Sequence, residues 1–265
     1  MKKIYLILFA LMTLSVNAQK NDEQDESTQQ ITKTYKVKKN NGKLLLNLGT
    51  VTVEGYKGNE IVFSVTAEDA GEDKRAEGLQ IVNALGLKDN TGLGINISEK
   101  DGVLEVNSLK KISFPDVKIL VPENIIVSFK HQSQYGGDVI FKNIQNEIEV
   151  AASYNSIKLE NVTGPATVKS IYGDVEAVFS QNVKGPLSII SVYGLADVTL
   201  PKSVKANLKT ITSYGEIYMS PDFKIDVEKK EELKNIGDEL IGKVNGGGTN
   251  IEIRSDYSKV YLRAK

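Results

Sequence analysis

The sequence predicts an all-β protein whose body is a parallel β-solenoid, a β-helix-like stack of two-strand rungs of about 20 residues each. Three observations predict this class. A tyrosine returns at a nearly constant spacing, similar residues surround it each time in the same direction, and a glycine follows most copies. The recurring tyrosines are Tyr135, Tyr154, Tyr172, Tyr193, Tyr214 and Tyr257. The last interval is about two periods long, which indicates a disguised rung or an inserted segment.

The residues around each tyrosine fall into columns. Two residues before it stand small side chains, and four and six before it stand mostly apolar ones, as do three and five after it. Because residues two apart on a strand share a face, each repeat reads as a strand, a bend at glycine and a second strand. An antiparallel sandwich with a coincidental period is the alternative. Columns that repeat in one direction favour the parallel stack.

The tyrosine column should form a ladder along one ridge. Equivalent residues of stacked strands lie about 4.8 Å apart. By alternation along the strand the rings should point inward, which favours packing over a role as a platform for sugar rings. Gly136, Gly173, Gly194 and Gly215 supply the bend, which needs either a positive φ or a close backbone approach. Asn155 and Ser258 take this position in the other copies.

The N-terminus reads as a secretory signal peptide over residues 1–18. Lys2 and Lys3 precede an apolar run, and Val16 and Ala18 are small residues at a cleavage site. A membrane anchor is the alternative, although the run is shorter than a span requires. Residues 19–30 are polar and read as a disordered leader. A single solenoid-like domain is expected over residues 31–265.

Strands, a hairpin and an insertion are expected outside the regular repeat. Residues 32–67 read as strands, and within them Leu48 takes the tyrosine position of an early rung that begins near Lys43. Residues 72–86 fit a short helix or a loop, and a hairpin is expected around Asp101-Gly102. Residues 222–244 are charge-rich, which indicates an insertion with a partial helix.

Four apolar residues stand at positions that should face outward on neighbouring rungs: Ile171, Ile190, Val192 and Ile211. A contiguous exposed apolar patch usually marks a contact. Either this chain's own insertion or N-terminal strands cover the patch, or it binds a partner or a second copy.

The composition excludes several kinds of chemistry. The chain has no Cys and one His, so thiolate sites and a His-based metal cluster are excluded. Its 33 basic and 34 acidic residues give no electrostatic case for nucleic acid. His131 with Ser133 forms a weak hydrolase pair and fits an inward column equally well. Glu176 and Asp197 on adjacent rungs are the candidate carboxylate pair of a polysaccharide-cleaving β-helix.

Three segments resemble the exported bacterial "putative adhesin" β-strand-repeat family, related to the auto-transporter adhesin-like head-GIN group. They are "NGKLLLNLGTVTVEGYKGNEIVF", the repeated S-x-Y-G-D-V type unit and "GKVNGGGTNIEIRSDYSKVYLRA". Together they span most of residues 32–265. The resemblance implies an all-β, β-helix-like fold and a cell-envelope location, and it carries no catalytic residues. The charged insertion and Ser258 depart from the family pattern.

These observations predict a non-enzymatic, exported protein of the periplasm, cell surface or medium that presents a rigid surface for adhesion or protein interaction. A carbohydrate-binding or carbohydrate-cleaving β-helix and a self-associating envelope subunit are the alternatives. No cofactor is expected. The expected partners are a protein, a glycan or a second copy, and not nucleic acid.

Overall fold

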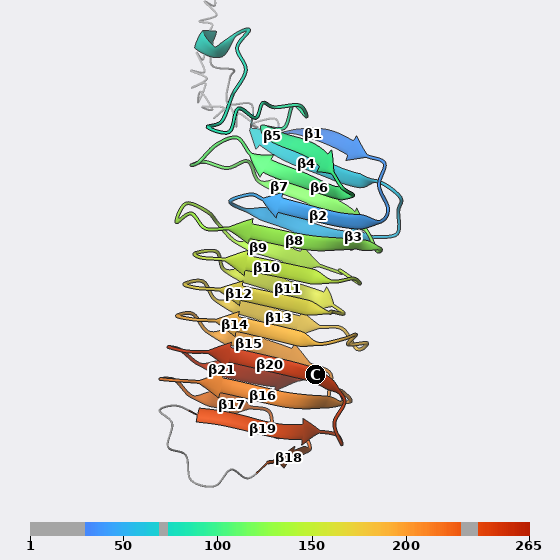
Figure 1. The fold of residues 1–265 in the computed structure, drawn as a ribbon, viewed down its shortest axis with the longest axis vertical. Helices are drawn as coiled ribbons and strands as arrows, with labels where there is room; N and C mark the ends of the chain where they lie inside the picture. The colour runs from blue at the N-terminus through green and yellow to red at the C-terminus, as the bar shows by residue number, and fades with distance from the viewer. Residues whose placement is uncertain (1–29, 69–73, 229–237) are drawn as a thin grey trace, which may run out of the picture.

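Two long β-sheets form the protein in a computed structural model that describes residues 30–68, 74–228 and 238–265. The predicted signal peptide and most of the predicted leader lie outside these residues, and the first strand begins at Gln30. Within the described ranges the helical content is a single 3-10 turn, Lys74–Ala76. The predicted all-β class is therefore confirmed. Figure 1 shows the strands stacked along one axis.

The first sheet has ten strands. In spatial order they are β1 (Gln30–Val37), β4 (Ile61–Glu68), β7 (Val117–Pro122), β3 (Val51–Tyr56), β9 (Val139–Lys142), β11 (Ile157–Val162), β13 (Val175–Phe179), β15 (Ala196–Leu200), β21 (Val260–Ala264) and β17 (Ile217–Met219).

The second sheet has eleven strands. In spatial order they are β18 (Ile225–Val227), β19 (Asp238–Val244), β16 (Ala206–Thr212), β20 (Thr249–Ser255), β14 (Leu187–Ser191), β12 (Ala166–Ser170), β10 (Ile148–Ala152), β8 (Ile125–His131), β2 (Gly42–Asn47), β6 (Val103–Ser108) and β5 (Ile95–Lys100).

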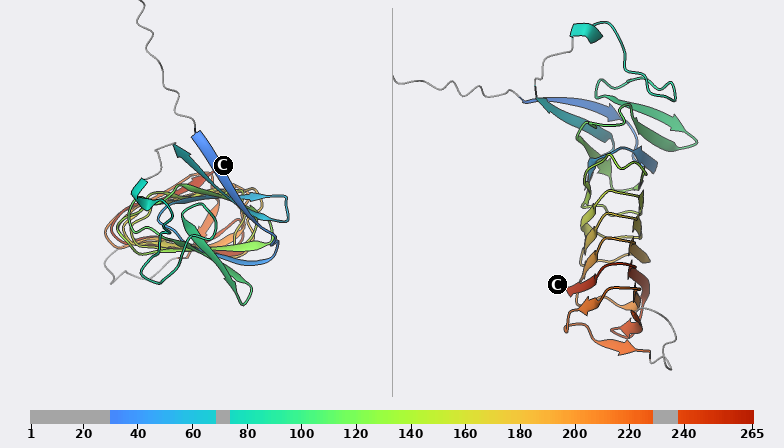
Figure 2. Two further views of the ribbon diagram at one scale, coloured as in Figure 1. Left: turned by 90° about the horizontal axis from the view of Figure 1, so that it is seen from above. Right: turned by 90° about the vertical axis from the view of Figure 1, so that its left-hand side faces the viewer.

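Each rung contributes one strand to each sheet, and the two strands meet at a corner. Neighbouring rungs pair in parallel, so that Val150 of β10 lies opposite Val168 of β12, which lies opposite Ile189 of β14. The columns therefore repeat in one direction, as predicted, and the antiparallel sandwich is excluded for these rungs. Figure 2 shows the resulting flattened tube from above and from the side.

The order of rungs in space differs from their order in the chain at both ends. The last rung, β20–β21, lies between β14–β15 and β16–β17. The first rung, β2–β3, likewise lies between β6–β7 and β8–β9. The doubled interval before Tyr257 is thus the length of the excursion that returns the chain to an inner position.

Antiparallel strands close the ends of the stack. β4 and β1 extend the first sheet, and the predicted hairpin around Asp101-Gly102 is confirmed as β5–β6 at the end of the second. At the other end β19 pairs with β16, and β18 pairs with β19. The helix predicted in residues 222–244 is wrong for the described part, which forms these two strands, while residues 229–237 lie outside the described ranges. Around the 3-10 turn, residues 77–86 lack regular secondary structure.

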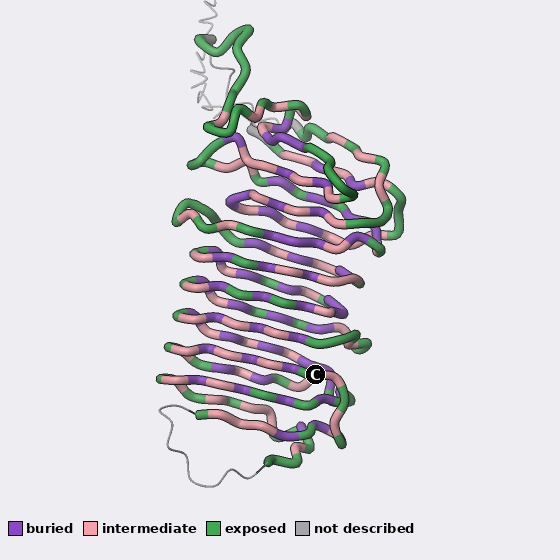
Figure 3. Tube along the Cα trace, in the orientation of Figure 1, coloured by how far each residue is buried: buried purple, intermediate pink, exposed green. Residues whose placement is uncertain are grey.

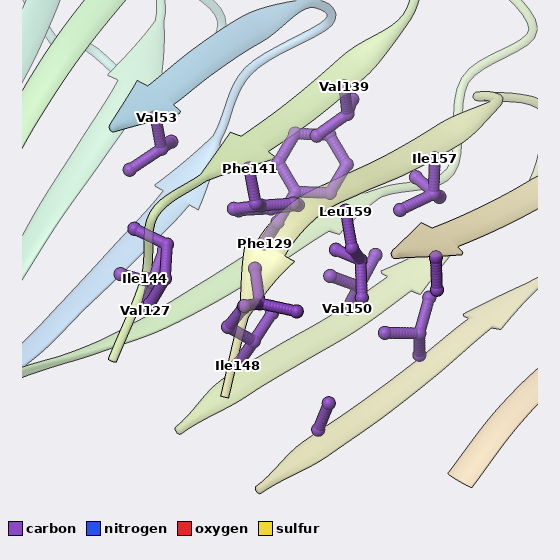
Figure 4. Packing of buried hydrophobic residues seen from close by; sticks show 14 of the residues in the cluster. Val53, Val127, Phe129, Val139, Phe141, Ile144, Ile148, Val150, Ile157 and Leu159 are labelled. Atoms are coloured by element: carbon purple, nitrogen blue, oxygen red, sulfur yellow. The ribbon is translucent and has the colours of Figure 1, made fainter. Parts of the chain in front are cut away.

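The core fills the space between the two sheets along the whole stack. Inward residues alternate with outward ones on nearly every rung strand, which Figure 3 shows as regular banding of buried positions. Figure 4 shows Phe129 and Phe141 packed among valine, isoleucine and leucine side chains of neighbouring rungs. The bulkiest fully buried side chains are Phe63, Phe129, Phe141 and Phe179. Toward β16 and β17 the core is filled by Leu208, Ile251 and Leu262 together with Ala196 and Ala206.

Candidate functional site

Five tyrosine rings form a continuous stack along one corner of the tube. Centroids of successive rings lie 4.8 Å apart for Tyr154 and Tyr172, 5.0 Å for Tyr172 and Tyr193, and 4.6 Å for Tyr193 and Tyr257. Tyr214 completes the stack at 5.1 Å from Tyr257. The planes of neighbouring rings are within 17° of parallel. We call these five residues the tyrosine ladder.

Buried hydroxyl groups hold the corners beneath the tyrosine ladder. Ser170 accepts a hydrogen bond from the Gly173 amide and donates one to the Asn155 carbonyl of the neighbouring rung. Ser191 and Ser255 donate in the same way to Gly173 and Gly194. This explains why the column two before the tyrosine holds a small hydroxyl residue at Ser170, Ser191, Thr212 and Ser255: it satisfies backbone groups that turn inward at the corner, whereas Ala152 in the Tyr154 copy makes no such bond.

The glycines serve close approach rather than a positive φ. A Cβ added at Gly173 would collide with the Asn155 carbonyl, and one at Gly215 with the Ser258 carbonyl. Neither glycine has a φ in the left-handed region. Glycine is therefore needed at these two bends for close backbone approach and not for a positive φ.

The prediction that the tyrosines point inward is wrong. Their exposed fractions run from 46% at Tyr154 to 67% at Tyr214. The strand before each corner ends at the small residue, for example at Ser170 in β12, so strand alternation no longer applies at the tyrosine. Each ring covers the face of the next, which leaves ring edges and phenol groups in a row on the surface.

Tyr135 does not belong to the tyrosine ladder. Phe129 lies opposite Val150 and His131 opposite Ala152, which shifts this copy by two positions from the predicted columns. The corner that follows is longer than the others and carries Tyr135 in an exposed loop. The early copy is shifted in the same sense, because Leu46 lies opposite Phe129 and Leu48 does not take the tyrosine position.

His131 and Asn155 close this irregular corner. Asn155 is 2% exposed, and its amide donates to the carbonyls of Gly49 and Gly137 while its oxygen lies 2.8 Å from Nδ1 of His131. The Ser133 hydroxyl accepts from the backbone amide of Tyr135. The polar contact of His131 is thus with an amide and not with a nucleophile.

Ile211 is separated from the other three outward apolar residues, whereas Val192 lies beside Ile171 on the neighbouring rung. All four are half-buried, and Arg254 of β20 lies between Ile190 and Ile211 in the pairing register. Arg254 forms an ion pair at 2.6 Å with Asp256, which takes the position of Val192 on the next rung of the stack. The inserted last rung therefore places an ion pair inside the predicted patch. The described part of the insertion extends the sheet beside Ile211 through Glu239.

Glu176 and Asp197 lie directly opposite each other on β13 and β15. Asp197 accepts hydrogen bonds from Nε and Nη2 of Arg263 at 2.7, 3.0 and 2.8 Å. These bonds raise the pKa of Arg263. Arg263 therefore occupies both carboxylate oxygens of Asp197, whereas a catalytic acid or base must have an oxygen free to meet the substrate.

An elongated groove of about 600 Å³ lies on the outer face of the second sheet. Its lining includes Thr167, Ser188, Asn207, Asn250 and Glu252 from neighbouring rungs. Pro165 and Pro186 close one side. The groove combines these polar groups with apolar atoms of Leu187, Ile241 and the two prolines, and such a mixed lining suits a ligand with both polar groups and apolar faces, such as a glycan. A second stacked pair, Tyr218 and Tyr261 at 5.2 Å, lies on the opposite sheet near Arg263.

The described residues bring together no group of three or more His, Cys, Asp or Glu side chains suited to a metal ion. Within the same residues, none of the helical structure is long and apolar enough to cross a membrane.

The fold is similar to that of a solved "putative cell adhesion protein" from Clostridium sporogenes, with a TM-score of 0.50 and 17% identity over 89% of this chain and 100% of that chain. A "putative adhesin" from Bacteroides fragilis matches with a TM-score of 0.45 and 17% identity over 90% and 98% of the two chains. No protein-family model and no curated protein matches the sequence.

Proposed function

We propose that this chain is a non-enzymatic, exported cell-envelope protein that presents a rigid β-solenoid surface for adhesion. The tyrosine ladder carries the proposal, because it is a continuous row of half-exposed aromatic edges on a stack whose corners are locked by buried hydroxyl groups. Aromatic residues are enriched at protein interfaces, where a rigid ring contributes contact area at small entropic cost. The fold similarity to the solved "putative cell adhesion protein" supports the same function.

The outer faces support binding by the ladder rather than by the strands. Ion pairs such as Lys142–Glu160, at 3.0 Å, and Arg263–Asp197, at 2.7 Å, lie on the outer face of the first sheet. Such paired surface charges remain in contact with water and contribute little free energy, which makes this face less suited to binding than the tyrosine ladder. The tyrosine ladder is the part of the described surface where large apolar side chains follow one another without interruption along the axis.

The test measures retention of beads coated with the full chain on immobilised collagen, fibronectin and laminin under flow. Tyr172→Ala with Tyr193→Ala should abolish retention on the surface that binds. Tyr172→Phe with Tyr193→Phe keeps the stack and should retain most of it. Lys158→Ala with Glu176→Ala, on the other sheet, is the matched control. Retention that survives the alanine pair, or no retention on any surface, contradicts the proposal.

Carbohydrate binding is the second candidate, and the groove on the second sheet favours it. It predicts selective signals on a glycan array that fall when Ser188 is replaced by Trp, which fills the groove. Release of reducing sugar that disappears in Glu176→Gln or Asp197→Asn would instead indicate cleavage. The bidentate contact between Asp197 and Arg263 argues against that outcome.

A further inference from the structure

The C-terminal rung occupies a slot between two rungs that are consecutive in the chain. β20 pairs with β14 on one side and with β16 on the other. β21 pairs in the same way with β15 and β17. A segment that follows both of these rungs in the chain is thus an interior layer between them.

The two walls of this slot are matched to each other. Ile251 lies opposite Leu187 on β14 and opposite Leu208 on β16, and Val260 lies opposite Ala196 and Ile217. Withdrawal of the rung would therefore leave β14 and β16 in register for direct pairing. The connection over residues 201–205 is intermediate in length between the corners 163–165 and 180–186, which each join adjacent rungs. The chain can therefore span the slot when it is filled or closed.

The rung is attached through a short turn of residues 245–248. Asn245, Gly246 and Gly247 have φ values of 49°, 88° and 88°. The turn carries the chain around the start of β16, from β19 on one side to β20 on the other. The Asn245 amide donates to the carbonyls of Lys202 and Val204. The turn therefore fixes which slot the rung enters.

We infer that the C-terminal rung, residues 249–264, also inserts into the slot of a second copy when two chains fold together, which yields a dimer by reciprocal rung exchange. Every strand pairing and core contact of the rung is the same in the exchanged dimer as in the single chain. Only the turn at residues 245–248 changes conformation. Exchange of an identical element is a low-cost route to a dimer for this reason.

The test uses the absence of native Cys. One chain carries Ser188→Cys and the other Glu252→Cys, because these two residues face outward directly opposite each other across β14 and β20. The chains are unfolded together, refolded by dilution and then oxidised. We expect the disulfide between positions 188 and 252 of different chains, identified by mass spectrometry, at a yield several-fold above that of a control pair.

The control pair replaces Ser188→Cys with Lys158→Cys, whose thiol lies outward on the other sheet and reports random collision. A yield equal to that of the control at every protein concentration overturns the inference. Deletion of Gly246 and Gly247 is an independent arm, because a turn too short to reverse favours exchange. It should increase the dimer fraction in light scattering, and an unchanged monomer with native circular dichroism contradicts the inference.

Discussion

Thr210 and Thr212 occupy successive inward positions of β16, yet their hydroxyl groups differ in hydrogen bonding. Thr212 donates to the Ser258 carbonyl and accepts from the Gly215 amide. The Thr210 hydroxyl is fully buried and has no hydrogen-bond partner in the structure. The equivalent residues Val150 and Val168 are valine. The lower part of the stack therefore keeps one polar group without compensation.

We expect Thr210→Val to stabilise the protein by about 1 kcal/mol, because it removes a buried unpaired hydroxyl group without a change in shape. Thr212→Val is the matched control and should destabilise by about 1–2 kcal/mol, because it leaves the Ser258 carbonyl and the Gly215 amide unpaired. The free energy of unfolding from urea denaturation measures both. A change in the free energy of unfolding that has the same sign in both variants would contradict this account.

Asn155 and Ser258 both replace the glycine of the repeat, but they differ in how much they contribute to the stability of the corner. The repeat pattern suggests that Asn155→Gly restores the consensus corner. We expect it instead to destabilise by about 2–3 kcal/mol, because three hydrogen bonds at the buried amide are lost. Ser258→Gly keeps its backbone contacts with Ser255 and Thr212 and should change stability by less than about 0.5 kcal/mol. Similar thermal midpoints for the two variants would show that Asn155 has no such role.

Glu149 on β10 reaches across β8 to Lys43 on β2, at 2.5 Å from its ammonium group. The hydrogen bond from Lys43 lowers the pKa of Glu149 below its ordinary value of 4.5. A lowered pKa in the folded state means that the contribution is present above pH 4.5 and is lost as the pH falls through the folded value.

Glu149→Gln should therefore reduce the free energy of unfolding at pH 7 by up to about 1 kcal/mol, the range of exposed ion pairs. The difference from the unmodified protein should shrink as the pH falls below 4.5 and vanish below the lowered pKa of Glu149 in the folded state. Chemical denaturation of both proteins at a series of pH values gives the comparison. A difference that is constant across the series would exclude the ion pair as its cause.

Residue columns predicted which side chains share a strand face, but not where a strand ends. Val168 and Ser170 lie inward as their alternation requires. Tyr172 follows the end of β12, where the backbone turns, so the same alternation gave the wrong side. No pattern in a single repeat marks that end. The small polar residue two before the tyrosine was the available signal, because a buried hydroxyl group there implies backbone groups that need a partner.

Among the elements, the order of the rings in the tyrosine ladder follows the order of the rungs in space and not their order in the chain. Tyr257 lies between Tyr193 and Tyr214, whereas Tyr214 is the end of the stack. Stacked aromatic pairs contribute about 0.5–1.5 kcal/mol each beyond buried area. Chain order would instead place Tyr214 in the middle.

We expect Tyr257→Ala to cost about twice as much stability as Tyr214→Ala, because it removes two ring contacts instead of one. Thermal unfolding monitored by circular dichroism compares the two variants, and Tyr154→Ala, at the opposite end of the stack, should resemble Tyr214→Ala. A larger loss for Tyr214→Ala than for Tyr257→Ala would restore the sequential order of rungs.

The period of the sequence predicted strands, direction and register, but it could not predict the order of rungs. Copies that share the same columns can stack in any order, since Ile251 fits equally beside Leu187 and Leu208. The insertion itself was predicted, but its strands were missed for a different reason. Its charge-rich sequence with scattered apolar residues indicated a partial helix, whereas pairing with the open edge of β16 stabilises a strand over Asp238–Val244. Tertiary pairing there overrides the local preference.

Across the whole molecule, protection of backbone amides from hydrogen exchange should follow a strand's position in the stack rather than its position in the chain. The final strand β21 pairs with a neighbour on each side, whereas β17 is the edge of its sheet and pairs only with β21. We expect backbone amides of residues 260–264 to exchange with deuterium more slowly than those of residues 217–219. Native-state hydrogen exchange with mass spectrometry gives both rates. Fast exchange at the C-terminus would mean that the last rung is only loosely inserted.

Insertion of the last rung also has a consequence during synthesis. The ribosome releases β14–β15 and β16–β17 before β20–β21, and these two rungs are matched for direct pairing. The nascent chain can therefore build a shorter stack in which β16 lies against β14. Completion then requires that this pairing open to admit the final segment. The neighbours of β14 and β16 are therefore settled only when a segment about 40 residues further along the chain has been made.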